Sequence, residues 1–173
     1  MTNPFTLRIY DSEPAAAQGQ VWKGGATDLT TRRIVADPPR WVHLADAALP
    51  PAEHKPLLAW DMEQINPGSL PSSETAGGVI LVSMTPDPER EEEFNDWYNT
   101  EHIPFFNRLP GVITARRFRA LTGSPRYVAL YHVETTDIYA TRGWMVINET
   151  PWILRMRRFQ RGRTYFMFNQ RVA

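Results

Sequence analysis

A histidine that follows a group of aromatic residues is the leading candidate for chemistry in this chain. His102 lies four positions after Tyr98, and Trp97 precedes that tyrosine. An imidazole titrates near neutral pH and can move a proton, whereas a tyrosine hydroxyl can hold a substrate oxygen. Positions four apart share a helix face, so we expect Tyr98 and His102 to be neighbours, with Asp96 and Glu101 available to orient the ring. The alternative is a histidine that caps the helix or fills the core.

His43 is a second candidate, and strand alternation is the argument for it. Alternate residues of a strand face opposite sides of the sheet, so Tyr127 and Tyr131 share one face. We expect that face to line a cavity, because tyrosines combine an apolar ring with a polar group. Trp41 and His43 hold matching positions in an earlier, similar stretch, so they are predicted to face the same cavity. A histidine at a solvated sheet edge is the alternative.

The remaining polar candidates have weaker arguments. Arg117 on a predicted strand could bind a substrate carboxylate or enolate in a bidentate manner, although strand arginines more often pair with acidic neighbours. His132 has the opposite parity to Tyr131, so we expect it to face the helices in a structural role, and His54 to be exposed. The later arginines, such as Arg157, are expected on a solvated helix face. The chain has no cysteine and no His-Glu-x-x-His motif, which excludes cysteine-containing metal sites. We predict no metal and no cofactor; the alternatives are a metal site of Glu101, His102 and His43, if the fold brings them together, and a haem-linked enzyme.

The elements that must position these residues are clearest in the second half. The pattern predicts strand 78–84, a helix from 87 that carries the aromatic group, strands 112–121 and 126–134, an irregular helical stretch over 144–159 and a strand at 164–171. This β-α-β-β-α-β order is that of the ferredoxin-like unit.

The first half looks like a diluted copy of the second. Residues 32–36 resemble 116–120, and residues 39–44 resemble 125–130. We therefore expect a strand at 6–10, little or no helix within 12–28, hairpin strands at 31–36 and 41–45, and a helix at 53–65. The predicted fold class is α+β: two tandem ferredoxin-like repeats that form a pseudo-dimeric α/β barrel, with the first repeat degenerate. The predicted boundaries are 1–66, a Pro/Gly/Ser-rich linker at 67–77, and 78–173.

Composition excludes several classes of protein. The chain has 173 residues, 42% of them hydrophobic, with nineteen basic and nineteen acidic side chains. Balanced charge gives no reason to expect a nucleic acid or an anionic membrane as partner. No apolar run reaches membrane-spanning length, and residues 1–10 do not read as a signal peptide, so we expect a cytoplasmic protein.

The run Trp97-Tyr98-Asn99-Thr100-Glu101-His102-Ile103-Pro104, followed by Leu109-Pro110-Gly111 and an arginine-rich strand, resembles the EthD-like branch of the dimeric α/β-barrel proteins. The resemblance covers about residues 78 to 173. It implies two ferredoxin-like sheets that face each other, helices outside, and a small hydrophobic ligand inside the barrel. Members of the family include cofactor-free monooxygenases, isomerases, cyclases, lyases and haem-using enzymes, so the fold does not fix the reaction.

Together these observations predict a cofactor-independent enzyme for a hydrophobic, aromatic, oxygenated small molecule. His102, Tyr98 and His43 would carry out proton transfer as in a lyase, isomerase or cyclase. The expected substrate-binding residues are Trp41, Trp97, Tyr127, Tyr131, Arg117 and Asp96. A cofactor-free monooxygenase and a non-catalytic binding protein are the alternatives. The chain is expected to be a monomeric pseudo-dimer or a homodimer.

Overall fold

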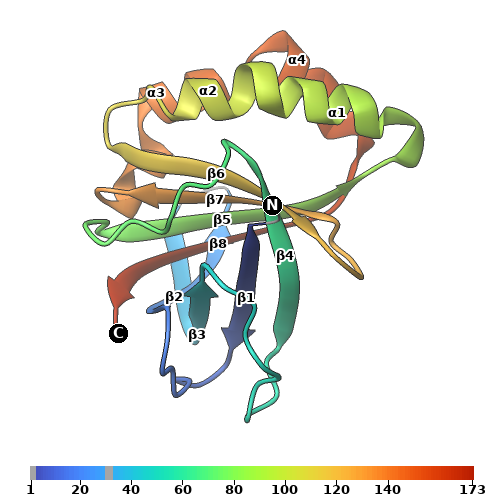
Figure 1. Ribbon diagram of the computed structural model, residues 1–173. Helices are drawn as coiled ribbons and strands as arrows, with labels where there is room; N and C mark the ends of the chain where they lie inside the picture. Colours follow the sequence, from blue (N-terminus) through green and yellow to red (C-terminus); the bar gives the residue numbers. More distant parts are fainter. Residues whose placement is uncertain (1–2, 30–32) are drawn as a thin grey trace.

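Eight antiparallel strands close into a barrel, and the helices of the described residues all cover the outer face of its second half (Figure 1). This computed structural model describes residues 3–29 and 33–173. The predicted mixture of helices and strands is therefore confirmed as an α+β barrel.

The first half consists of strands within the described residues. They are β1 (Pro4–Tyr10), β2 (Gln20–Asp28), β3 (Arg33–Ala45) and β4 (Leu58–Asn66). The helix predicted at 53–65 is wrong, because the segment that contains Trp60 and Met62 is β4. The same residues also alternate with period two: Trp60, Met62 and Gln64 are buried, while the intervening Asp61 is exposed. The two predicted hairpin strands are one long strand, β3, and residues 30–32 lie outside the described part.

The second half follows the predicted order. Its strands are β5 (Gly78–Pro86), β6 (Val112–Ala120), β7 (Tyr127–Val133) and β8 (Gln160–Arg171). The helices form one layer of two segments. The first segment comprises a 3-10 turn (Pro88–Arg90), α1 (Glu91–Trp97), a π-helical turn (Tyr98–His102) and α2 (Ile103–Phe106). The second comprises a 3-10 turn (Thr136–Ala140), α3 (Arg142–Ile147), α4 (Pro151–Met156) and a 3-10 turn (Arg157–Phe159).

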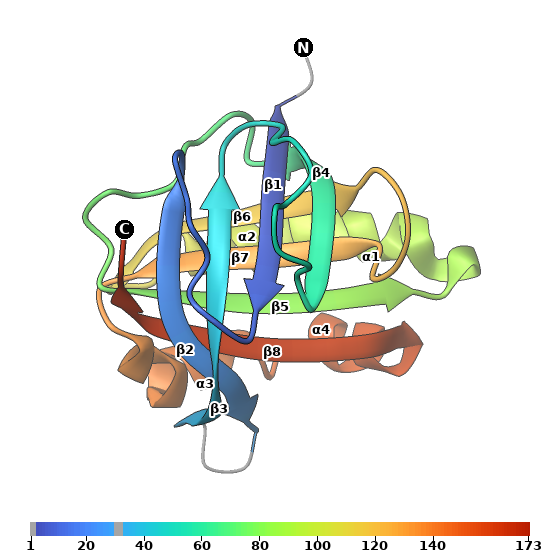
Figure 2. The ribbon, with the colours of Figure 1, turned by 90° about the horizontal axis from the view of Figure 1, so that it is seen from below.

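The two halves order their strands in the same way. The sequence of neighbours is β4-β1-β3-β2 in the first half and β8-β5-β7-β6 in the second, and the pairs β2–β8 and β4–β6 close the barrel. Seen from below, the strands of one half cross those of the other steeply (Figure 2). Residues 39–44 lie on β3, and most of the similar stretch 125–130 lies on β7, which has the same place in the strand order of its half. Residues 33–36 also lie on β3, whereas the similar stretch 116–120 lies on β6, so that part of the internal similarity has no structural counterpart.

The barrel interior is packed with side chains. Every strand contributes to one buried core: Phe5, Leu7, Ile9, Trp22, Val42, Leu44, Trp60, Met62, Val79, Leu81, Phe118, Val128, Leu130 and Phe168. The rings of Phe5 and Phe118, from opposite halves, stack with their centroids 4.1 Å apart. An eight-stranded barrel is just wide enough for side chains to fill it. The expectation that a ligand binds inside the barrel is therefore wrong, because side chains fill this space.

The predicted faces of β7 are inverted. Val128 and Leu130 point into the barrel, whereas Tyr127 and Tyr131 point outward to the helices. Alternation assigns residues to two faces but does not say which face is which. All seven residues of this strand are buried, so hydrophobicity could not decide either.

One charged group is enclosed with the barrel core. Arg116 is fully buried, lies over the rings of Phe5 and Phe118, and donates to Asp46 (2.7 Å) and Ser72 (2.8 Å). His132 is buried on the same inner side, so the expectation that it faces the helices is wrong. Burial first, and then the charge of Arg116, lowers the pKa of His132 to about 3.

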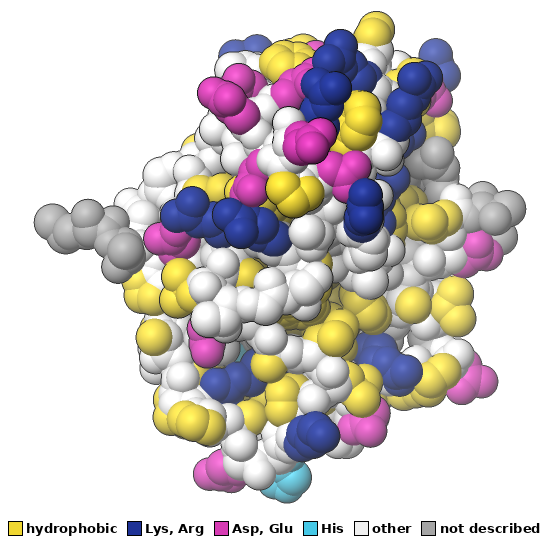
Figure 3. Space-filling model, turned by 90° about the vertical axis from the view of Figure 1, so that its right-hand side faces the viewer, with side chains coloured by type: hydrophobic (Ala, Val, Ile, Leu, Met, Phe, Trp, Pro, Cys, Tyr) yellow, Lys and Arg dark blue, Asp and Glu magenta, His cyan; other side chains and the backbone are white. Residues whose placement is uncertain are grey.

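The surface shows no segregation of charge on the face drawn in Figure 3, where basic and acidic side chains are interspersed over the helical layer. Within the described residues, no helix combines the length and apolar character needed to cross a membrane.

Candidate active site

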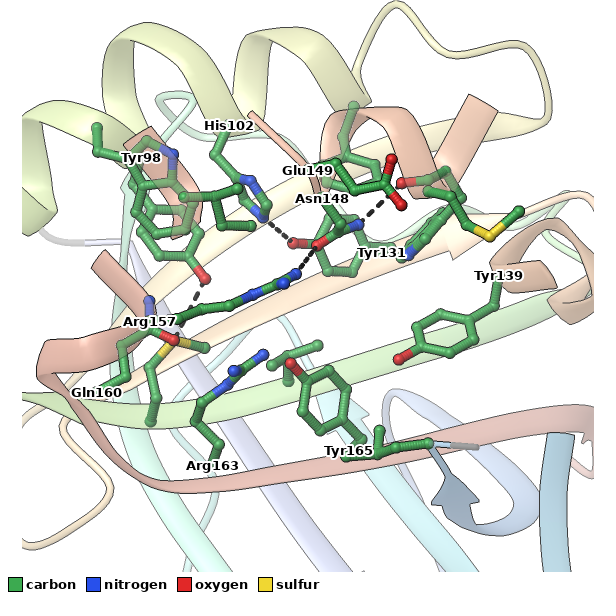
Figure 4. A pocket seen from close by; sticks show the side chains of 18 residues that line it. Tyr98, His102, Tyr131, Tyr139, Asn148, Glu149, Arg157, Gln160, Arg163 and Tyr165 are labelled. Atoms are coloured by element: carbon green, nitrogen blue, oxygen red, sulfur yellow. Dashed lines mark hydrogen bonds between the residues drawn. The ribbon is translucent and has the colours of Figure 1, made fainter. Parts of the chain in front are cut away.

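A cavity of about 270 Å³ lies between the helical layer and the outer face of the second-half sheet. We name it the helix-side cavity (Figure 4). Its walls come from the helices and from β5, β7 and β8: Leu29, Val82, Met84, Trp97, Tyr98, His102, Phe106, Tyr131, Tyr139, Trp144, Met145, Asn148, Glu149, Ile153, Arg157, Gln160, Arg163 and Tyr165. It is close to the lower end of the usual range for small-molecule sites, ~300–1,000 Å³.

A widened helical turn places the imidazole. Pro104 has no N–H and its ring clashes with the carbonyl four residues earlier, so regular α-helix cannot continue through this point. The backbone instead forms a π-helical turn, in which the N–H of Ile103 donates to the carbonyl of Tyr98, five residues back. Such turns often occur at functional sites, and this one directs both Tyr98 and His102 toward the sheet.

His102 is held in an aromatic shell with one polar partner. Its Nε2 lies 3.1 Å from the hydroxyl of Tyr131. Its ring centroid lies 4.5 Å from that of Trp97 and 4.8 Å from those of Tyr98 and Phe106. Burial first, and then the nearby positive charges of Arg157, Arg117 and Arg163, lowers the pKa of His102 to about 3. The ring is therefore neutral at ordinary pH.

The two tyrosines beside His102 are neutral as well. Burial raises the pKa of Tyr98 to about 12, and burial raises the pKa of Tyr131 well above its usual value. The hydroxyl of Tyr98 donates only a weak hydrogen bond, to the sulfur of Met84 at 3.4 Å. Both tyrosines can therefore donate a hydrogen bond to a ligand oxygen.

The floor of the cavity carries two arginines. Arg157 donates to the side-chain oxygen of Asn148 (3.3 Å), and the side-chain N–H of Asn148 donates to the carbonyl of Trp144 (3.0 Å). Arg163 rises from β8 with its guanidinium 5.0 Å from the ring centroid of Tyr165 (Figure 4). Burial first, and then the charge of Arg157, lowers the pKa of Arg163.

Four of the predicted site residues meet at this cavity: His102, Tyr98, Trp97 and Tyr131. Tyr131 reaches it although its face was predicted wrongly, because the cavity is outside the barrel rather than inside. The expected partners of the ring do not orient it. Asp96 is exposed to solvent, and Glu101 accepts hydrogen bonds from Trp97 (3.2 Å) and Thr150 (2.5 Å), which ties the π-helical turn to α4.

Tyr127 and Arg117 lie behind the cavity wall. Tyr127 donates to Glu91 (2.5 Å), and Arg117 donates to Asn95 (2.7 Å). The guanidinium of Arg117 is sandwiched among aromatic rings, at 4.3 Å from the centroid of Tyr98 and 4.4 Å from that of Tyr127. Burial lowers the pKa of Arg117 to about 10. In this position it supports Tyr98 from behind and does not line the cavity.

His43 and Trp41 belong to the other half of the barrel. His43 points outward, contacts the carbonyl of Gln18 through Nε2 (2.6 Å), and lines a separate cavity of about 320 Å³ with Arg8 and His54. Trp41 lies under the amine of Lys23, 5.2 Å from the ring centroid, and is partly exposed. The prediction that these two residues face the same space as His102 is therefore wrong. Their positions were inferred from Tyr127 and Tyr131, whose direction had been inverted.

Sequence reasoning missed the arginines and the amides of the cavity. Arg157 was expected on a solvated helix face, where Arg155 does lie, paired with Glu93 at 2.8 Å. Arg157 instead sits in the 3-10 turn that leads into β8, and this change of backbone turns it inward. A signal was present in β8, where Arg163 and Tyr165 are two apart and hence share a face.

No group of three or more metal-ligating side chains gathers among the residues that the structure describes.

Comparison with solved structures supports the fold. No protein-family model matches the chain, and no curated protein matches it either. A proposed monooxygenase from Fusobacterium nucleatum is similar over 98% of this chain and 94% of that chain, with a TM-score of 0.57 and 8% identity. A proposed monooxygenase from Lactobacillus acidophilus has a TM-score of 0.53 and 10% identity over 100% and 97%.

A third structure carries the same fold. It is a ferredoxin-fold protein of Listeria monocytogenes, related to antibiotic biosynthesis monooxygenases, with a TM-score of 0.52 and 9% identity over 96% of this chain and 95% of that chain. At such low identity these likenesses show the fold alone. The chain thus has the ferredoxin-like α/β-barrel fold of these proteins.

Proposed function

We propose that this chain is a cofactor-independent enzyme that binds a small aromatic, oxygenated molecule in the helix-side cavity and transfers a proton through His102. The observation that carries this proposal is the contact of the His102 imidazole with the Tyr131 hydroxyl at 3.1 Å, on the wall of an aromatic cavity. Proton removal from the carbon next to a carbonyl, or from a phenol hydroxyl, needs at least a positioned base and a hydrogen-bond donor beside it.

The proton moves from a carbon or oxygen acid of the substrate to His102, and the electron pair stays on the substrate as an enolate or phenolate. His102 is neutral at ordinary pH, so one ring nitrogen has a lone pair that can take up a proton. The anion formed beside it stabilises the imidazolium, because opposite charges attract strongly where water is excluded. Tyr131 or Tyr98 donates a hydrogen bond to the oxygen on which negative charge develops.

A lyase, isomerase or cyclase step uses this anion directly. The second candidate is a cofactor-free monooxygenase, and the likeness to proteins described as monooxygenases favours it. In that case the substrate anion itself reduces O₂. One oxygen atom enters the product and the other leaves as water. Both candidates share the proton transfer to His102.

The test combines oxygen consumption with product analysis on an anthrone. Formation of the quinone with uptake of O₂ supports the monooxygenase, whereas turnover of a ketone or enol substrate without O₂ uptake supports the isomerase, cyclase or lyase. In either case His102→Gln must lose turnover. If His102→Ala lowers ligand affinity and the wild-type protein turns over no substrate, the chain is a binding protein.

We further propose that the chain is two tandem ferredoxin-like repeats, residues 1–66 and 78–173 joined by 67–77, with the first repeat degenerate. The shared strand order of the two halves supports this, and connecting segments in the first half take the place of helices. The motif from Trp97 to Pro104 supports placement in the EthD-like branch. One chain closes the barrel alone, so we expect a monomer, which sedimentation equilibrium would test against the chain mass of 19.9 kDa.

A further inference from the structure

Among the residues that the structure describes, Arg163 brings into the helix-side cavity a positive charge that no acidic side chain pairs with, although Glu149 also lines this cavity. In the described part of the chain, Arg163 forms no ion pair, and its buried Nε has no hydrogen-bond partner. A nearby arginine on the same strand does have an acidic partner. Arg161, two residues earlier on β8, is exposed and pairs with Asp87 at 2.5 Å.

A second guanidinium makes this arrangement more costly. Arg157 lines the same cavity and repels Arg163, which contributes to the lowered pKa of Arg163. Arg157 also donates a hydrogen bond to the side-chain oxygen of Asn148 (3.3 Å). Burial of two like charges close together is unfavourable unless an opposite charge is supplied. A ligand with a negative group would supply the opposite charge that Arg163 lacks.

The walls opposite the arginines determine the rest of the ligand. Trp97, Trp144 and Tyr139 line the same cavity as the two arginines, and the ring of Tyr165 lies against Arg163. In Figure 4 the two guanidiniums point into the space below His102 and Tyr131. A flat aromatic body fits between the rings. A guanidinium binds a planar carboxylate through two parallel hydrogen bonds.

We infer that the ligand of this cavity is an aromatic carboxylate, or an aromatic acid of the same charge, whose anionic group is bound by Arg163 with Arg157 beside it. The inference rests on the proposed function only in that both use the same cavity. The anionic end lies on Arg163 of β8 and on Arg157 of the preceding 3-10 turn, and the aromatic body extends toward His102 and Tyr131. The acid group selects the substrate, and the proton transfer takes place at the other end.

The experiment compares two probes of equal size, 2-naphthoate and its neutral analogue 2-naphthamide, by isothermal titration calorimetry. The wild-type protein should bind the carboxylate at least about tenfold more tightly, because hydrogen bonds between charged groups are stronger than neutral ones. Arg163→Gln should remove this preference, and Arg163→Lys should retain part of it. Arg161→Gln is the matched control from the same strand and should leave the preference unchanged.

Equal affinity of the wild-type protein for the two probes, or no binding of 2-naphthoate, overturns the inference. So does a full preference for the carboxylate in Arg163→Gln. If Arg163→Gln does not fold, as judged by circular dichroism, the wild-type preference and the Lys variant still decide. The proton-transfer proposal fails separately: turnover that survives in His102→Gln contradicts it while leaving the carboxylate preference intact.

Discussion

The imidazole Nε2 of His102 lies 3.1 Å from the hydroxyl of Tyr131, and the two residues come from elements on opposite sides of one cavity. His102 projects from the π-helical turn and Tyr131 from the outer face of β7. Neither belongs to the barrel core, which is filled by apolar side chains from both halves. The proposed site therefore lies between the helices and the sheet.

Removal of the imidazole should strongly reduce the catalytic rate with little change in fold. We expect His102→Gln to lower kcat by about a hundredfold or more, the lower end of what a general base contributes. His54→Gln is the control, because His54 is exposed. Steady-state kinetics on the substrate identified by the anthrone and ketone screen would measure it, and a near-native rate in His102→Gln would refute the role.

The two tyrosines should differ in their effect. Tyr131→Phe removes the hydroxyl that contacts His102, so we expect kcat to fall by about 10- to 100-fold. Tyr98→Phe removes a hydroxyl that, among the described residues, donates only to the sulfur of Met84, so we expect a smaller loss. If the order of the two losses is reversed, Tyr98 is the oxygen-binding group and Tyr131 serves the fold.

Stability should fall in mild acid because two histidines are buried without charge. Burial lowers the pKa of His102 and of His132 to about 3, below the usual value of 6.5, so the unfolded chain binds more protons than the folded one as pH falls from 6.5 toward 3. Well above pH 6.5 both histidines are neutral in the folded and the unfolded chain, so neither lowers the stability of the fold there. Between pH 7.5 and pH 5.0 each histidine should cost the folded state ~2 kcal/mol.

Urea unfolding at the two pH values would measure this loss. His132→Gln should show a loss smaller by about 2 kcal/mol than the wild-type protein, whatever its stability at pH 7.5. An unchanged pH dependence in that variant would mean that His132 is protonated in the folded state.

The buried arginine of the barrel should depend on its partner. Burial opposes ionisation of Asp46, but the charge of Arg116 and hydrogen bonds from Arg116 and Ser72 outweigh it and lower the pKa of Asp46. Asp46→Asn should destabilise the protein by ~1–3 kcal/mol, because Arg116 loses its counter-charge while fully buried. Asp61→Asn, at an exposed position of β4, is the control. Equal unfolding midpoints for the two variants would contradict this account.

The sequence indicates the second half far better than the first. The strands and the aromatic helix of residues 78–173 follow strong period-two and helical patterns, so their order could be predicted. In the first half, Leu58 to Ile65 satisfies both patterns, and only pairing of β4 with β1 and β6 decides in favour of the strand. Pairing between strands that are distant in the sequence cannot be inferred from a short stretch of residues.

The site was predictable where chemistry follows from local spacing, as for Tyr98 and His102. Which face of β7 points into the barrel could not be predicted, because all residues of this strand are buried. The internal similarity then carried the same error over to His43. Arg157 and Arg163 were missed since their inward direction depends on the 3-10 turn before β8 and on the place of β8 in the barrel.

The most direct test of the location of the site uses methionine methyl groups as reporters. Met84 and Met145 line the helix-side cavity, whereas Met62 lies in the barrel core. In ¹³C-methyl-methionine protein titrated with 2-naphthoate, we expect the resonances of Met84 and Met145 to shift in proportion to occupancy while that of Met62 stays in place. A shift of Met62, with Met84 and Met145 unchanged, would put the ligand inside the barrel and contradict the account.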